Sequence, residues 1–200
     1  MNIMNQARGF QLPSAEDIAN LGPAERASMA ALLLEGLEPG RQPLELFTQF
    51  SRLIVAATVE VVPVRTVSKQ PEVWLGRRSK DDPWYPDKWV LPGVVILPDD
   101  KQDEENTLLG PIKRLFKADL QGIQQVSDLH QIPSQFRFDG RGHEVTTQYW
   151  THVQTGSEPY EGRFFGQDDL QDPQFKDDIL TEGLLTIDRA IADYEAQRTA

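Results

Sequence analysis

The spacing of hydrophobic residues changes near position 54, and this change divides the chain into two regions. In the first region, a capping-box pattern at Ser14 and Asp17 predicts one helix, and Pro23 suits the first turn of a second helix. Apolar residues recur at helical spacing between Met29 and Leu37 of that second helix. We therefore expect residues 1–51 to form a helical N-terminal extension.

From Ile54 to Val64 the residues are β-branched or short, which predicts a largely buried strand. Glu72 to Arg78 predicts a second strand, and the segment from Ser79 to Lys88, with two prolines, predicts an exposed loop. The same reasoning predicts a short strand over 94–97, a helix that begins near 111, a hairpin over 136–153, and a final helix over 180–196. This mixture of strands and helices predicts a single α/β domain over residues 52–200.

Composition limits the partners of the chain. Its 200 residues carry a formal net charge of −11, so its general field repels the phosphates of nucleic acids and anionic membranes. The absence of cysteine excludes disulfides, thiolate metal sites and a thiol nucleophile. No apolar run reaches the roughly 18 residues that a membrane span needs. We expect a cytoplasmic protein that binds neither nucleic acid nor membrane.

A short motif, Trp89-Val90-Leu91-Pro92-Gly93, lies between the second predicted strand and the acidic loop near Asp100. It resembles the Trp-x-Leu-Pro-Gly-Gly approach to the Nudix box. Leu75-Gly76-Arg77-Arg78-Ser79 is similar to the second strand of that family, and Asp168-Asp169-Leu170 is similar to the stretch before its last helix. The order of these pieces resembles the Nudix hydrolase family over roughly residues 52–196. The resemblance implies an α/β/α sandwich with a mixed sheet.

The family's box runs Gly, five residues, Glu, seven residues, then Arg-Glu-hydrophobic-x-Glu-Glu-x-Gly. Its glutamates lie on adjacent turns of one helix, where their carboxylates hold magnesium against a diphosphate. Two alignments of this helix are open. One places the Arg-Glu pair on Lys113-Arg114 and the Glu-Glu pair on Lys117-Ala118; the other places them on Leu115-Phe116 and Asp119-Leu120. Both predict a degenerate Nudix box in which at most one acid survives.

Other acids provide an alternative metal site. An insertion after the glycine contains Asp99, Asp100, Asp103, Glu104 and Glu105, which could supply carboxylates from a loop. The competing interpretation is that this charge run is a solvated surface. Glu144 lies outside the box, where some family members have a catalytic base, and without a metal we expect it to be an exposed polar residue.

Basic residues around the motif are the candidates for ligand contact. We take Arg77, Arg78, Lys80, Trp89 and Gly93 as ligand-binding residues and assign no catalytic or metal-binding residue. Strand alternation sends Arg77 and Arg78 to opposite faces, so one of them is expected to face a pocket. For Trp89 the simpler interpretation is a core residue, and for the arginines it is pairing with Asp81 or Asp82.

We therefore expect a Nudix-like protein that has lost or weakened magnesium-dependent diphosphate hydrolysis and that binds a small nucleotide-like ligand or a partner, without a cofactor. The alternative is an active hydrolase of nucleoside diphosphate derivatives, with magnesium held by Asp99, Asp100, Glu104 or Glu105 together with Asp119. A third hypothesis is a homodimer that forms through the leucines between Met29 and Leu37.

Overall fold

The computed structural model describes residues 14–35, 37, 43–51, 53–98, 100, 108–139, 142–155 and 162–199. The chain divides into two compact units, residues 1–39 and 40–200. The predicted boundary after residue 51 lies at the end of the first helix of the second unit. In the described part of the chain, no helix combines the length and apolar character needed to cross a bilayer.

The first unit contains two helices, α1 (Ala15–Asn20) and α2 (Pro23–Glu35). The predicted capping box is present before α1, because the Ser14 hydroxyl accepts the Asp17 N–H at 3.1 Å and the Asp17 carboxylate accepts the Ser14 N–H at 3.0 Å. Helix α2 begins at Pro23, as predicted, and has no buried residue. Its leucines are uncovered, since Leu32 is 73% exposed and Leu33 is 52% exposed.

The second unit contains, in chain order, α3 (Leu44–Ser51), β1 (Val55–Val67), β2 (Gln70–Arg77), β3 (Trp89–Val90), β4 (Gly93–Val95), α4 (Leu109–Ala118), β5 (Ile123–Gln125), β6 (His130–Asp139), β7 (Gly142–Thr155), β8 (Gly162–Gly166), α5 (Gln167–Gln171), α6 (Pro173–Lys176) and α7 (Thr181–Thr199). The eight strands form a mixed sheet. Its central path is β3-β2-β1-β7-β5, while β4 pairs with β1, β6 with β7 and β8 with β2. Strands β1 and β7 are parallel, and the other pairs are antiparallel.

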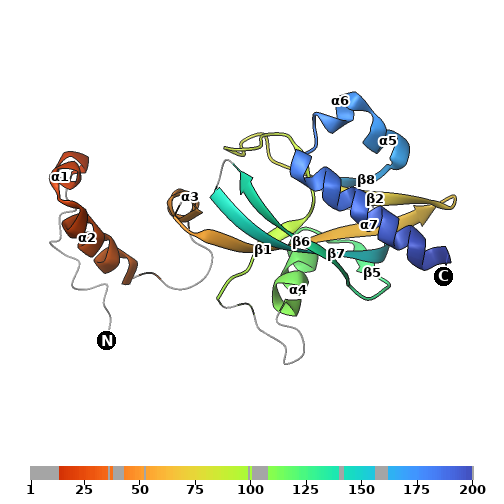
Figure 1. Ribbon diagram of the computed structural model, residues 1–200, viewed down its shortest axis with the longest axis horizontal. Coiled ribbons are helices and arrows are strands. Elements are labelled where there is room, and N and C mark those ends of the chain that lie inside the picture. Colours follow the sequence, from red (N-terminus) through yellow and green to blue (C-terminus); the bar gives the residue numbers. More distant parts are fainter. Residues whose placement is uncertain are drawn as a thin grey trace. The chain divides into compact units, whose positions relative to one another are not determined.

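Helices α4 and α7 cover opposite faces of this sheet (Figure 1). Alternation along β1 explains the two layers: Val59 and Val61 pack with α4, whereas Val62 and Val64 pack with α7. Burial of these two apolar layers stabilises an α/β/α sandwich, which confirms the predicted fold class. The same alternation decides which side chains reach the site.

Strand β1 pairs with two different strands on the side away from β7. Thr58 to Glu60 lie opposite β4, whereas Val64 to Val67 lie opposite β2. Between these segments, the N–H of Val61 donates to the carbonyl of Pro92 at 3.1 Å. The Trp-x-Leu-Pro-Gly motif therefore lies where the sheet separates into two parts.

Candidate functional site

A cavity of about 400 Å³ lies beside the motif, between the end of β2 and the end of α4. Its lining includes Trp74, Gly76, Arg78, Gly93, Ala118 and Asp119. We call it the α4 cavity. It brings together two segments that the sequence singled out separately, the Arg-rich strand end and the helix that we predicted to carry a degenerate Nudix box.

Arg78 directly follows β2, and its side chain lines the α4 cavity. Its backbone N–H donates to the carbonyl of Lys88 at 2.9 Å, which fixes the residue at the mouth of the loop. One guanidinium nitrogen lies 3.6 Å from a carboxylate oxygen of Asp82. Its Nε is buried and has no hydrogen-bond partner among the described residues. A buried donor without a partner is unfavourable, so the group is suited to receive an acceptor from a ligand.

Arg77 also lines the α4 cavity, but its guanidinium is engaged elsewhere. Its Nε donates to Asp87 at 2.9 Å, and its guanidinium carbon lies 4.7 Å from the ring centre of Trp89. The hydrogen bond from Arg77 lowers the pKa of Asp87, which keeps this pair charged. The structure therefore separates the two arginines, and Arg78 has the free donor.

The other three predicted residues take different places. Trp89 packs edge-on against Phe165, with ring centres 4.8 Å apart, and so contributes to the core. Lys80 is exposed and does not line the cavity. Gly93 lines the cavity and approaches β1 closely, because a Cβ at this position would lie 2.9 Å from Cγ of Glu60. The glycine is thus required by the close approach of two strands.

Helix α4 presents few acids to the cavity. Ala118 and Asp119 line it, so Asp119 is the carboxylate that the end of α4 contributes. Arg114 turns instead to Asp100, donating from two nitrogens to the two carboxylate oxygens at 2.9 Å each, and also donates to the carbonyl of Val95 at 2.6 Å. Asp100 is therefore held by an arginine. Asp99, Asp103, Glu104 and Glu105 lie outside the described residues.

The resemblance of the sequence to the Nudix hydrolase family implies a magnesium ion. Magnesium needs near-octahedral oxygen ligands. Within the described ranges, no group of three or more His, Asp or Glu side chains is placed to hold a metal ion. The described residues thus do not fit a magnesium site.

A second, smaller cavity of about 80 Å³ lies on the α7 side of the sheet and shares Arg78 and Gly93 with the α4 cavity. Its lining also includes Glu60, Arg137 and Glu144. Glu144 is 8% exposed, so the expectation of an exposed polar residue was wrong. It is buried because even-numbered residues of β7 face the α7 side, where Glu144 lies directly opposite Arg137 of β6.

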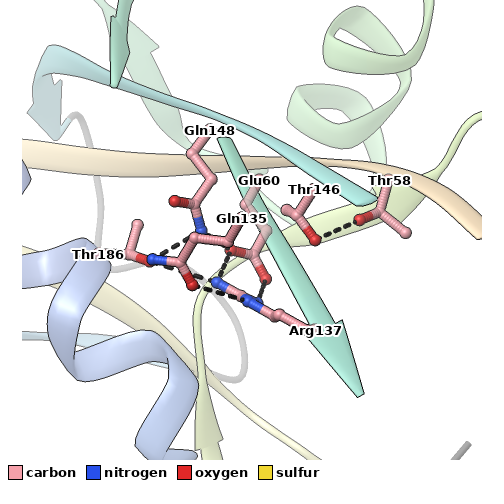
Figure 2. Close-up of polar contacts among 7 residues, drawn as sticks. All are labelled: Thr58, Glu60, Gln135, Arg137, Thr146, Gln148 and Thr186. Atoms are coloured by element: carbon pink, nitrogen blue, oxygen red, sulfur yellow. Dashed lines mark hydrogen bonds and ion pairs between the residues drawn. The ribbon is translucent and has the colours of Figure 1, made fainter. Parts of the chain in front are cut away.

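Beside this smaller cavity lies a polar network (Figure 2). Arg137 donates to both carboxylate oxygens of Glu60, at 2.6 and 2.9 Å. Gln148 donates to Glu60 at 2.9 Å and to the hydroxyl of Thr186 at 2.8 Å, and Thr186 also accepts from Arg137 at 3.2 Å. Nearby, Thr58 donates to Thr146 at 2.8 Å. The network ties β1, β6 and β7 to α7.

Our sequence reasoning missed this network. The available signal was Glu60, the only charged residue in the largely apolar run from Ile54 to Val64, because a charge at a core-facing position needs a partner from elsewhere in the fold. The polar run Thr146-Thr147-Gln148 inside β7, between Val145 and Tyr149, was a second signal. Neither pattern identifies Arg137 as the partner of Glu60, since the two residues are 77 positions apart in sequence.

Comparison with solved structures identifies the fold. The NUDIX domain of NrtR from Shewanella oneidensis, in complex with ADP ribose, is 20% identical and has a TM-score of 0.50; the match covers 94% of this chain and 100% of that one. A protein from Jonesia denitrificans, described as a possible asymmetric diadenosine tetraphosphate hydrolase, is 15% identical with a TM-score of 0.50, over 70% of this chain and 94% of that one. These likenesses show the fold alone.

A longer NrtR structure from Shewanella oneidensis, in complex with a 27mer DNA, is 22% identical with a TM-score of 0.47. The match covers 67% of this chain and 59% of that one, so this chain spans less than two thirds of its length. That this chain binds no nucleic acid remains a prediction. No family model and no curated protein sequence matches the chain. On the structural evidence, the chain has the Nudix fold.

Proposed function

We propose that this Nudix-fold chain is a binding module for a small nucleotide-like anion, and that it has lost or weakened magnesium-dependent diphosphate hydrolysis. The observation that carries the proposal is the Nε of Arg78, a buried donor with no partner among the described residues, beside the α4 cavity. The cavity's volume of about 400 Å³ falls within the range of small-molecule sites, roughly 300–1,000 Å³.

The donors at this cavity favour a ligand that is rich in acceptors. Phosphate oxygens accept hydrogen bonds and carry charge, and bonds from a guanidinium to such groups are short and strong. A diphosphate would therefore satisfy Arg78 without a bridging cation.

The loss of hydrolysis is supported by the residues that one of the two alignments places at the box carboxylates. Arg114 binds Asp100, and Ala118 offers a methyl group to the cavity. Magnesium stabilises the charge that develops on a transferring phosphoryl group, so without its ligands a bound diphosphate is held but not activated. The ADP-ribose complex of the NrtR NUDIX domain supports ADP-ribose as the first probe.

Isothermal titration of the full chain with ADP-ribose, ADP and pyrophosphate tests the proposal, each in EDTA and in magnesium. We expect saturable binding of at least one probe, equally tight in both buffers. Arg78→Gln should weaken it about 10- to 100-fold, the effect of losing a hydrogen bond to a charged group. Arg26→Gln, an exposed arginine on α2, makes the same charge change and should leave the affinity unchanged.

Two results would contradict this function. If none of the three probes binds, the proposal that the chain is a binding module is wrong. Magnesium-dependent turnover of ADP-ribose that is abolished by Asp119→Asn would establish the alternative instead, a hydrolase with a rearranged metal site. Asp119 is the residue to change because it lines the cavity from the end of α4.

A further inference from the structure

An uncovered aromatic surface lies on the outer part of the β6–β7 hairpin. Phe136 is 67% exposed, Phe138 is 71% exposed, and both rings contact His143, with ring centres 5.7 and 4.6 Å away. Val145 and Val55 continue this surface at 44% and 52% exposure. We call these five residues the β6 patch. None of them carries a carboxylate, although the chain has a net charge of −11.

The strand that carries the patch also has an open edge. Among the described residues β6 pairs only with β7, on one side. Every second residue of an antiparallel strand turns its N–H and C=O away from its neighbour, so the other side of β6 offers unpaired backbone groups. Pro133 and the register shift between Ile132 and Gln135 interrupt the first half of this edge. The second half, residues 135–139, has no such interruption.

We propose that β6 pairs antiparallel with β6 of a second copy of this chain, across a two-fold axis at Arg137. The sequence Gln135-Phe136-Arg137-Phe138-Asp139 is symmetric in its aromatic positions. A two-fold at Arg137 therefore places each Phe136 opposite Phe138 of the second copy. Directly opposite side chains in such a pair are about 5 Å apart at Cβ, a distance at which aromatic rings pack.

The central residue does not oppose this pairing. Two arginines opposite one another would repel, but the Arg137 guanidinium is on the face away from the phenylalanines and is neutralised by both oxygens of Glu60. A second copy also covers both phenylalanines at once, because Phe136 of each chain packs against Phe138 of the other. An interface of this kind is isologous and closes at two subunits. This surface is distinct from the leucines of α2.

Sedimentation equilibrium of the full chain tests the proposal. We expect a species of twice the 22.6 kDa chain mass that dissociates on dilution. Phe136→Lys/Phe138→Lys should shift the chain to the monomer, because it places four ammonium groups at the interface. The matched control is Leu32→Lys/Leu33→Lys on α2, which should retain the dimer. Circular dichroism checks that both variants are folded; their side chains are more than half exposed.

Hydrogen exchange of the unmodified chain gives a second measurement that needs no variant. The backbone amides of residues 135–139 should become more protected as concentration rises through the dimer transition. A monomer at all concentrations, a dimer that persists in the phenylalanine variant, or dimerisation without added protection of these amides would each overturn the proposal. A dimer lost only in the leucine variant would also overturn it and would place the contact on α2.

Discussion

Arg137 and Glu60 form a two-point ion pair between β6 and β1, with nitrogen–oxygen distances of 2.6 and 2.9 Å. The two side chains are largely buried, at 11% and 15% exposure. Removing charges from water is unfavourable, so the pair is maintained by its geometry and by the added hydrogen bond from Gln148. It fixes the strands that surround the smaller cavity.

Arg137→Met should lower the free energy of unfolding by about 3 kcal/mol, because it leaves Glu60 buried without its cation. The double variant Glu60→Met/Arg137→Met should recover most of this loss, since apolar side chains of similar length often replace a buried pair at little cost. Urea unfolding at neutral pH measures both. A single variant within about 0.5 kcal/mol of the unmodified chain would show that water reaches Glu60 freely.

Gly162 of β8 should not tolerate a side chain. A Cβ there would lie 2.1 Å from Cζ2 of Trp74 and 2.6 Å from the carbonyl oxygen of Leu75. Trp74 is 2% exposed and belongs to the core on the α4 side, so a shift of its ring would disturb the packing of its neighbours. Gly162→Ala should therefore lower the free energy of unfolding by roughly 1–3 kcal/mol.

Gly183 of α7 provides the control for that substitution. A Cβ at Gly183 would meet Leu91 at 3.8 Å, an ordinary contact, in a helix where alanine is favoured over glycine. Gly183→Ala should leave stability unchanged or raise it by up to about 1 kcal/mol. Thermal unfolding of the two variants compares them, and equal losses of stability in both would contradict the role assigned to Trp74.

The layers of the fold followed from local patterns, because the β-branched run of β1 and the apolar spacing of α4 each require burial on a known face. Sequence spacing also correctly predicted the capping box at Ser14 and the start of α2 at Pro23. It missed β3, β5 and the full length of β6. These segments are short or polar, and long-range pairing rather than local preference makes them strands.

The candidate site could be predicted less well from the sequence, for the same physical reason. Arg77 and Arg78 were found together, but only the structure separates the arginine that pairs with Asp87 from the one with an unpaired Nε. Glu60 and Arg137 are far apart in sequence, so no local spacing connects them. A tertiary contact between single residues leaves no periodic signal in one sequence.

Asp100→Asn should show how the contribution of Asp100 to the free energy of unfolding depends on pH. The hydrogen bond from Arg114 is the main cause of the lowered pKa of Asp100, and burial opposes it. A carboxyl group whose pKa is lowered by folding contributes stability above its unfolded value, about 3.9, and this contribution is lost as pH falls through the folded pKa. The unmodified chain should thus be more stable than the variant by roughly 2 kcal/mol at pH 7.

The stability difference between the two proteins should be constant from neutral pH down to about 5 and should shrink below about 4. Urea unfolding at a series of pH values measures this difference. Asp87→Asn is the matched comparison, since Asp87 also pairs with an arginine but is more exposed, and it should have a smaller effect. A difference for Asp100 that grows as the solution is acidified would contradict the assigned ion pair.

Ala118→Glu should create part of a cation site, because it adds a second carboxylate beside Asp119 at the end of α4. Ala118, Asp119 and Asp82 line the same cavity, so the new carboxylate would stand beside Asp119 in a cavity that Asp82 also lines. Hard divalent cations bind where several carboxylate oxygens converge. We expect the variant to bind manganese at least 10-fold more tightly than the unmodified chain, as measured by electron paramagnetic resonance.

Gln124→Glu is the control, because it adds the same charge at an exposed position of β5. This variant should bind no more manganese than the unmodified chain. Equal gains in the two variants would mean that net charge, rather than the geometry of the α4 cavity, attracts the ion.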